Sequence, residues 1–285
     1  MRLSALISPP AGWSYDEVVA HARAAEAAGF AAYWVADHFY GGEGEPDRDC
    51  LEAWTLLAAL ARDTTRVRLG TLVTAHSYRN PALLAKIAAT VQELSGGRLE
   101  LGIGAGWKAN EYRAYGYEFP PPGVRVAQLA ETLEICTRLW TEERVTFEGR
   151  HYRVRDAVAS PKPAPRPPVW VGGAKPRIMR VAARYADGFN IGRIGDPPRP
   201  PDALALAGLI AELGRAAAEA GRERPLRLSH WASFELEDRS ASARLVEHAK
   251  RLAGSGVEEL QLHFPRGRER EMAERAGLEV IPLLS

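Results

Sequence analysis

Hydrophobic residues in this chain follow two spacings that alternate from one end to the other. Short apolar runs rich in β-branched residues predict strands that are buried on both faces. Longer segments with apolar residues three or four positions apart predict amphipathic helices. The predicted strands are residues 2–8, 31–36, 67–74, 99–103, 169–171, 188–191, 226–235 and 257–264. The predicted helices are residues 14–28, 52–61, 81–95, 124–140, 176–185, 202–220, 240–253 and 269–276.

The stretch 67–107 contains the repeating unit in its clearest form. An apolar run at 67–74 is followed by Asn80 and Pro81, which are typical of a helix cap and of the first helical position. A second apolar run follows at 99–103. A strand–helix–strand unit predicts parallel strands with a right-handed crossover. Both strands end in small or polar residues, and parallel sheets place ligand sites at such ends.

Eight such alternations within 285 residues predict a single (β/α)8 TIM barrel over residues 1–285, with a doubly wound open sheet as the alternative. One segment, residues 143–168, interrupts the alternation. It contains a run at 145–154 that is typical of a β-hairpin turning at Glu148 and Gly149, followed by a proline-rich stretch. Because the alternation resumes directly afterwards, we interpret 143–168 as an insertion before the fifth strand.

Composition and charge narrow the class of protein. The 37 basic and 36 acidic residues leave a net charge of +1, so nothing favours nucleic acid or an anionic membrane as a partner. No apolar run reaches membrane-spanning length, and the chain begins with a predicted strand in place of a signal peptide. Cys50 and Cys136 have no metal-type spacing and are expected to be reduced thiols. We expect a cytoplasmic homodimer that acts on a small molecule.

Three glycines, Gly102, Gly104 and Gly106, occupy alternate positions at the end of a predicted strand. The dinucleotide-binding fingerprint is excluded, because Trp107 stands where it requires a further glycine and the next predicted helix is too distant. Two alternatives stay open. The glycines form a tight turn that leaves the strand, or their amides approach a phosphate or a ring.

A second glycine pair, Gly172 and Gly173, precedes a predicted helix that carries Lys175 and Arg177 near its start. Exposed amides, the positive end of a helix dipole and two cations would converge at this point. The pattern therefore predicts an anion site.

Asp37 and His38 form an acid–imidazole pair at the end of the second predicted strand. Histidine carries protons near neutral pH, and a carboxylate beside it can tune that property. The alternative is a structural pair that holds the following loop, residues 41–49. His76 also follows a strand, and we interpret it as solvated. The remaining histidines have no metal-ligand spacing, and no nucleophile motif of a hydrolase is present.

Seven segments together resemble the bacterial luciferase-like superfamily, in the right order over nearly the whole chain. They are residues 34–39 (WVADHF), 70–74 (GTLVT), 78–86 (YRNPALLAK), 94–107 (LSGGRLELGIGAGW), 147–152 (FEGRHY), 168–174 (PVWVGGA) and 185–189 (YADGF). The resemblance implies a (β/α)8 barrel with an insertion near strand five that binds reduced FMN or the deazaflavin F420. The ending Asp37-His38-Phe39 looks more like the F420-dependent oxidoreductases.

The resemblance also implies roles for individual residues. His38 is the expected proton carrier, and the peptide bond between Leu72 and Val73 is expected to be cis, in a bulge that backs the central ring of the cofactor. The residues expected to bind the cofactor are Asp37, Leu72, Val73, Thr74, Gly106, Trp107, Asn110, Gly172, Gly173 and Ala174. The last three match a phosphate loop, and no metal ligand is implied.

The resemblance favours an F420-dependent oxidoreductase that moves a hydride between the deazaflavin and a small organic substrate. An FMNH2-dependent monooxygenase and a non-catalytic flavin-binding protein are the alternatives. The Asp37–His38 pair argues against the last, because a carrier needs no proton-transfer group. Trp107 departs from the sugar-phosphate dehydrogenase branch, which has an acidic residue there, so glucose 6-phosphate is not the expected substrate. Residues 41–49 and the insertion would shape the substrate pocket.

Overall fold

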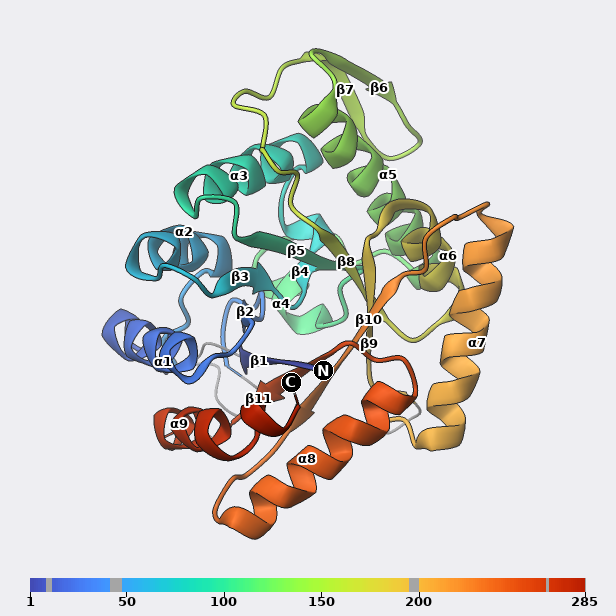
Figure 1. Cartoon of the computed structure of the whole chain (residues 1–285). Coiled ribbons are helices and arrows are strands. Elements are labelled where there is room, and N and C mark those ends of the chain that lie inside the picture. Colours follow the sequence, from blue (N-terminus) through green and yellow to red (C-terminus); the bar gives the residue numbers. More distant parts are fainter. Residues whose placement is uncertain (9–11, 42–47, 195–199, 265–266, 285) are drawn as a thin grey trace.

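The computed structural model describes residues 1–8, 12–41, 48–194, 200–264 and 267–284. Within these residues, eight parallel strands form a closed barrel (Figure 1). In ring order they are β1 (Arg2–Ile7), β2 (Ala32–Val35), β3 (Arg68–Thr71), β5 (Leu99–Gly104), β8 (Val169–Gly173), β9 (Gly188–Ile191), β10 (Arg227–Ser233) and β11 (Glu259–His263). Pairing of β1 with β11 and of β3 with β5 closes the ring, which confirms the barrel and excludes the open sheet.

Helices surround the barrel (Figure 1). The outer layer consists of α1 (Tyr15–Ala28), α2 (Ala53–Asp63), α3 (Pro81–Leu94), α5 (Pro122–Thr141), α6 (Pro176–Tyr185), α7 (Ala203–Glu219), α8 (Arg239–Gly254) and α9 (Glu269–Glu279). Shorter elements are β4 (Thr74–Ala75), η1 (His76–Tyr78), α4 (Ala109–Ala114) and η2 (Ile281–Leu283). The predicted cap of α3 is confirmed, since the Asn80 side chain accepts from the amides of Ala82 and Leu83.

The insertion forms the predicted hairpin, β6 (Val145–Glu148) and β7 (Arg153–Ala157), which lies beside α5 at the periphery of the barrel (Figure 1). Its turn occupies residues 149–152 and is therefore longer than the turn predicted at Glu148 and Gly149. The carboxylate of Glu131, on α5, explains the difference. It accepts hydrogen bonds from the three successive amides of residues 150–152 at 2.9, 3.0 and 2.9 Å.

Two tryptophans fill the barrel interior. The rings of Trp34 and Trp170 meet edge to face with centroids 6.3 Å apart, and both side chains are fully buried. A Cβ at Gly70 would overlap Trp34, and one at Gly188 would overlap Trp170. Inward-facing glycines on neighbouring strands therefore provide the space that the indole rings need.

Buried carboxylates bind these rings from the N-terminal end of the barrel. Glu259 accepts from the indole N–H of Trp34 at 3.0 Å and pairs with Arg2 at 2.7 Å. Glu100 likewise accepts from the indole N–H of Trp170 and pairs with Arg68. Because Arg2 and Arg68 are the first residues of their strands, these ion pairs close the N-terminal end. The opposite end, where the strands finish, is the mouth of the barrel.

Candidate functional site

The peptide bond between Leu72 and Val73 is cis, as predicted. It separates β3 from β4 and directs the side chain of Val73 toward β5 and β8. A Cβ added at Gly104 or Gly172 would lie 2.9 or 3.0 Å from carbons of Val73, and one at Gly102 would overlap the carbonyl oxygen of Thr71. Gly102 and Gly104 lie inside β5, so they do not form the turn that leaves the strand, and the approach of their amides to a phosphate or a ring stays a prediction.

Gly106 lies just beyond β5 and has a left-handed backbone, with φ of 75°. A Cβ at this position would overlap the hydroxyl of Tyr112. Glycine therefore allows the chain to leave the barrel over Tyr112 and enter α4. This path brings Trp107 to the mouth, where its side chain is 72% exposed.

His38 follows β2, and its Nδ1 lies 3.0 Å from Oε2 of Glu111. Glu111 lies on α4 and is completely buried. The same carboxylate accepts from Nζ of Lys108 at 2.9 Å, from the hydroxyl of Tyr78 at 2.8 Å and from the amide of Phe39 at 3.1 Å. Glu111 is thus the acceptor around which this side of the mouth is organised.

The charge of Glu111 determines the tautomer of His38. Burial, the largest influence, would raise the pKa of Glu111, but hydrogen bonds from His38, Lys108 and Tyr78 lower it to about 2. An ionised carboxylate only accepts hydrogen bonds, so Nδ1 of His38 carries a proton. In the neutral imidazole, Nε2 is then the atom that can take up a proton. Burial and the bond to Glu111 raise the pKa of Tyr78, which keeps it a donor.

Because adjacent strand residues point to opposite faces, Asp37 is not expected to pair with His38, and the structure gives its carboxylate other partners. It is bound by Arg79 at 2.7 and 3.0 Å and by the amide of Ala75 at 3.1 Å, and its side chain is 1% exposed. Arg79 also pairs with Glu52. The carboxylate of Asp37 therefore fixes the strand ends and does not tune the imidazole.

Thr74 is likewise occupied within the protein. Its hydroxyl donates to Thr71 at 2.8 Å and accepts from the indole of Trp54 at 3.1 Å. The side chains of Thr74 and Asp37 are both buried, so a cofactor could reach these two residues only through their backbone. Their contact with a cofactor stays a prediction.

The predicted phosphate loop lies where β8 leads into α6. Gly172, Gly173 and Ala174 are half-buried, and no side chain among the residues that the structure describes caps the N-terminus of α6. Amide groups at an uncapped helix start fit an anion. A Cβ at Gly173 would lie 2.7 Å from Ile178, so packing against α6 also requires glycine there. The anion site itself stays a prediction.

Trp107 lies against His38, and Asn110 lies at the start of α4. The indole of Trp107 meets the imidazole edge to face, with centroids 5.7 Å apart and planes at 84°. Oδ1 of Asn110 accepts from the amide of Glu111 at 3.1 Å, which supports the start of α4.

His76 is completely buried, which corrects its interpretation as a solvated residue. Neither of its ring nitrogens has a hydrogen-bond partner among the described residues. Burial, together with electrostatic repulsion from the neighbouring Arg125 and His151 side chains, lowers the pKa of His76 to about 3, so the ring is neutral.

Sequence reasoning missed Glu111, Lys108 and Tyr78. The first two lie three positions apart on α4, a short helix that was not predicted. Only this spacing, which brings two side chains to one face of a helix, could have indicated the pair. Nothing in the sequence indicates that Glu111 is buried.

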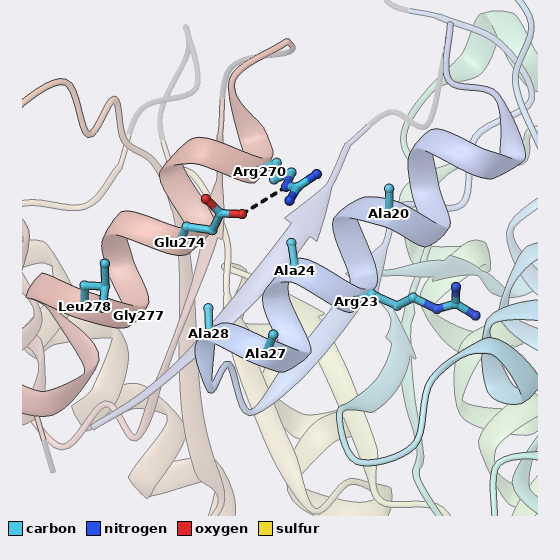
Figure 2. A pocket seen from close by; sticks show the side chains of 9 residues that line it. All are labelled: Ala20, Arg23, Ala24, Ala27, Ala28, Arg270, Glu274, Gly277 and Leu278. Atoms are coloured by element: carbon cyan, nitrogen blue, oxygen red, sulfur yellow. Dashed lines mark hydrogen bonds and ion pairs between the residues drawn. The ribbon is translucent and has the colours of Figure 1, made fainter.

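A surface depression of about 660 Å³ lies between α1 and α9 (Figure 2). Small residues of α1, such as Ala24 and Ala27, form one wall, and the ion pair Arg270–Glu274 of α9 lies on the other. All of its lining residues belong to these two outer helices, so it is separate from the mouth.

Among the described residues, no cluster of three or more His, Cys, Asp or Glu side chains could hold a metal ion. No helix in the described ranges is both long and apolar enough to cross a membrane.

The family model described as "Luciferase-like monooxygenase" matches residues 3–279, and the chain belongs to this family. It is 41% identical over 176 residues to an F420-dependent glucose-6-phosphate dehydrogenase of Intrasporangium calvum, a match that covers 61% of this chain and 52% of that protein. It is 31% identical over 263 residues to the F420-dependent hydroxymycolic acid dehydrogenase of Mycobacterium tuberculosis, a match that covers 91% of this chain and 70% of that protein.

The first of these matches spans only about half the length of the curated relative. A solved structure, an F420-dependent secondary alcohol dehydrogenase in complex with an F420-acetone adduct, matches with a TM-score of 0.84 over 100% of this chain and 99% of that chain. At 19% sequence identity, this likeness establishes the shared fold.

Proposed function

We propose that this protein is an F420-dependent oxidoreductase that transfers a hydride between the deazaflavin and a small organic substrate. The observation that carries the proposal is the pair His38–Glu111 at the mouth of the barrel, where His38 follows β2 and the bulge at Leu72 and Val73 follows the neighbouring strand β3. The names of the two curated relatives support the choice of cofactor. An FMNH2-dependent monooxygenase is the second candidate, because the matching family model is described as a luciferase-like monooxygenase.

The residues present fit such a cofactor. The bulge would back its ring, since Gly104 and Gly172 leave room for Val73 there. The amides of residues 172–174 and the start of α6 would hold its phosphate, with Lys175 and Arg177 adding positive charge. Gly106, Trp107 and Asn110 would contact its ring or tail. When bound, the deazaflavin supplies two-electron chemistry by accepting or giving a hydride.

His38 manages the proton that accompanies the hydride. As the C–H bond of an alcohol substrate breaks, Nε2 takes the hydroxyl proton and a C=O bond forms. The negative charge of Glu111 stabilises the resulting imidazolium through Nδ1. In the reverse direction, Nε2 returns the proton to the carbonyl oxygen. General acid–base catalysis of this kind contributes typically about 10²–10⁴-fold in rate.

Cofactor binding tests the proposal. Purified protein is titrated with F420 and, separately, with FMN, and the dissociation constants are measured by fluorescence quenching and equilibrium dialysis. Tight binding of F420 alone supports the oxidoreductase, and tight binding of FMN alone supports the monooxygenase. Binding of neither contradicts both. The homodimer expected from the sequence also stays a prediction, which light scattering in solution tests.

A further inference from the structure

Aromatic side chains gather on the side of the mouth where β2 ends and α4 begins. Trp107 is 72% exposed and Tyr115 is 54% exposed. The ring of Phe39, next to His38 in the chain, stacks on Tyr115 with centroids 4.2 Å apart and planes at 27°. Large aromatic surfaces left in water beside a candidate proton carrier indicate a surface that binds an apolar ligand.

Trp107 is the aromatic residue in direct contact with His38, through the edge-to-face pair already described. A substrate whose hydroxyl reaches His38 therefore places the substituents of its reacting carbon against the indole. An indole offers a flat apolar face and a single N–H donor. It can cover an aromatic group, but it cannot satisfy the several hydroxyls of a sugar, which would lose hydrogen bonds to water.

The cations of this network are already engaged. Lys108 donates to the carbonyls of Tyr40 and Gly41 at 3.2 and 2.9 Å and to Glu111 at 2.9 Å. Arg79 is held by the carboxylates of Asp37 and Glu52. Neither side chain is free to neutralise a phosphate on the substrate, and phosphate recognition depends on free cations or amides.

We infer that the substrate is an alcohol, or the corresponding carbonyl compound, whose reacting carbon carries an aromatic group, and that Trp107 determines this specificity. The inference rests on the hydride transfer proposed above. When bound, the deazaflavin would accept the hydride, which is the hydrogen of the C–H bond at the reacting carbon together with its electron pair. The hydroxyl proton passes to His38, and the C=O bond forms. These bond changes are the same for every alcohol substrate. Alcohols differ in the group that lies against Trp107, and this group therefore determines which of them is preferred.

Steady-state kinetics with F420 test the inference on three substrates: 1-phenylethanol, 2-propanol and glucose 6-phosphate. We expect kcat/KM for 1-phenylethanol to exceed that for 2-propanol at least about tenfold, since an aromatic contact and its buried area are together worth about one factor of ten or more. Glucose 6-phosphate should be the poorest substrate. Trp107→Ala should abolish the preference for 1-phenylethanol, and Trp107→Phe should retain most of it. Leu278→Ala, at an 81% exposed site on α9, is the control and should change nothing.

Two further measurements separate this inference from the proposed function. The affinity of each variant for F420 is determined, and kinetics are compared at saturating F420. Binding of acetophenone to the cofactor-free protein is followed by ligand-observed NMR, and it should weaken in Trp107→Ala.

If the wild type transfers hydride but prefers 2-propanol or glucose 6-phosphate, the inference is overturned and the proposed function stands. If no F420 binds, the proposed function fails, and the acetophenone titration decides the inference. Binding that depends on Trp107 supports an aromatic site, and absence of that dependence overturns it.

Discussion

Oε2 of Glu111 lies 3.0 Å from Nδ1 of His38, although the two residues are 73 positions apart in the sequence. The carboxylate is buried and ionised, and it fixes the proton of the imidazole on Nδ1, the nitrogen that faces Glu111. Orientation of a histidine by a buried carboxylate is a general device for presenting the second ring nitrogen to a substrate.

Replacing His38 by Ala should lower turnover with F420 at least about a hundredfold, because the proton carrier is lost. Affinity for F420 should change little, since the cofactor is expected to rest mainly on the bulge and the phosphate loop. Turnover and F420 binding are measured in parallel, and thermal unfolding serves as the control for folding. Retained turnover would show that His38 is not the proton carrier.

Glu111→Gln should change how stability depends on pH. The ordinary pKa of a glutamate, 4.5, falls to about 2 at Glu111 in the folded protein. The ionised carboxylate therefore contributes stability above about pH 4.5 that is lost as the pH falls toward 2, in total about 3 kcal/mol.

Urea unfolding at pH 7, 5 and 3 should accordingly show a steeper loss of unfolding free energy in the wild type than in the Gln variant. The comparison isolates Glu111 from other carboxylates, such as Glu26, whose pKa is also lowered to about 2 by amide hydrogen bonds that outweigh its burial. Parallel pH dependences in the two proteins would contradict the ionised state of Glu111.

Ala174→Glu should weaken F420 binding at least about tenfold, because it places a negative charge beside the predicted phosphate. Ala174→Gln has nearly the same size without the charge and is the matched control. This pair avoids Gly173, where a larger residue would also press on Ile178. Equal affinities of the Glu and Gln variants would place the phosphate elsewhere.

Glu131→Ala should loosen the hairpin of the insertion, because three amides lose their acceptor. We expect faster hydrogen exchange at residues 150–152 and a loss of about 1–3 kcal/mol of unfolding free energy. Glu143→Ala, an exposed substitution just before β6, is the control. Unchanged exchange at these amides would mean that the turn holds without Glu131.

Gly188→Ala should destabilise the barrel by about 1–3 kcal/mol, because the added Cβ would overlap the ring of Trp170. Gly208→Ala, on α7, meets nothing within 4 Å and should instead stabilise the helix by about 0.5–1 kcal/mol. Chemical unfolding of both variants measures the two effects. Equal shifts would argue against the role assigned to the inward-facing glycines.

The sequence by itself determined the elements and their order. Apolar spacing located the barrel strands, and local signals such as Asn80 before Pro81 located helix starts, because these signals act within a few residues. Resemblance to a known family added the bulge at Leu72 and Val73, which the structure contains. The alternation of strand and helix was sufficient to predict a closed barrel.

Only the tertiary structure decided which side chains meet. Alternation along a strand separates the side chains of Asp37 and His38, but only the closed barrel places Asp37 against Arg79 and brings Glu111 to His38. Barrel closure also made Gly102 a neighbour of Val73 and buried His76. The partner of a buried charge is the group that remains closest once water is excluded, and that group is fixed by how distant strands and helices pack, which no local pattern records.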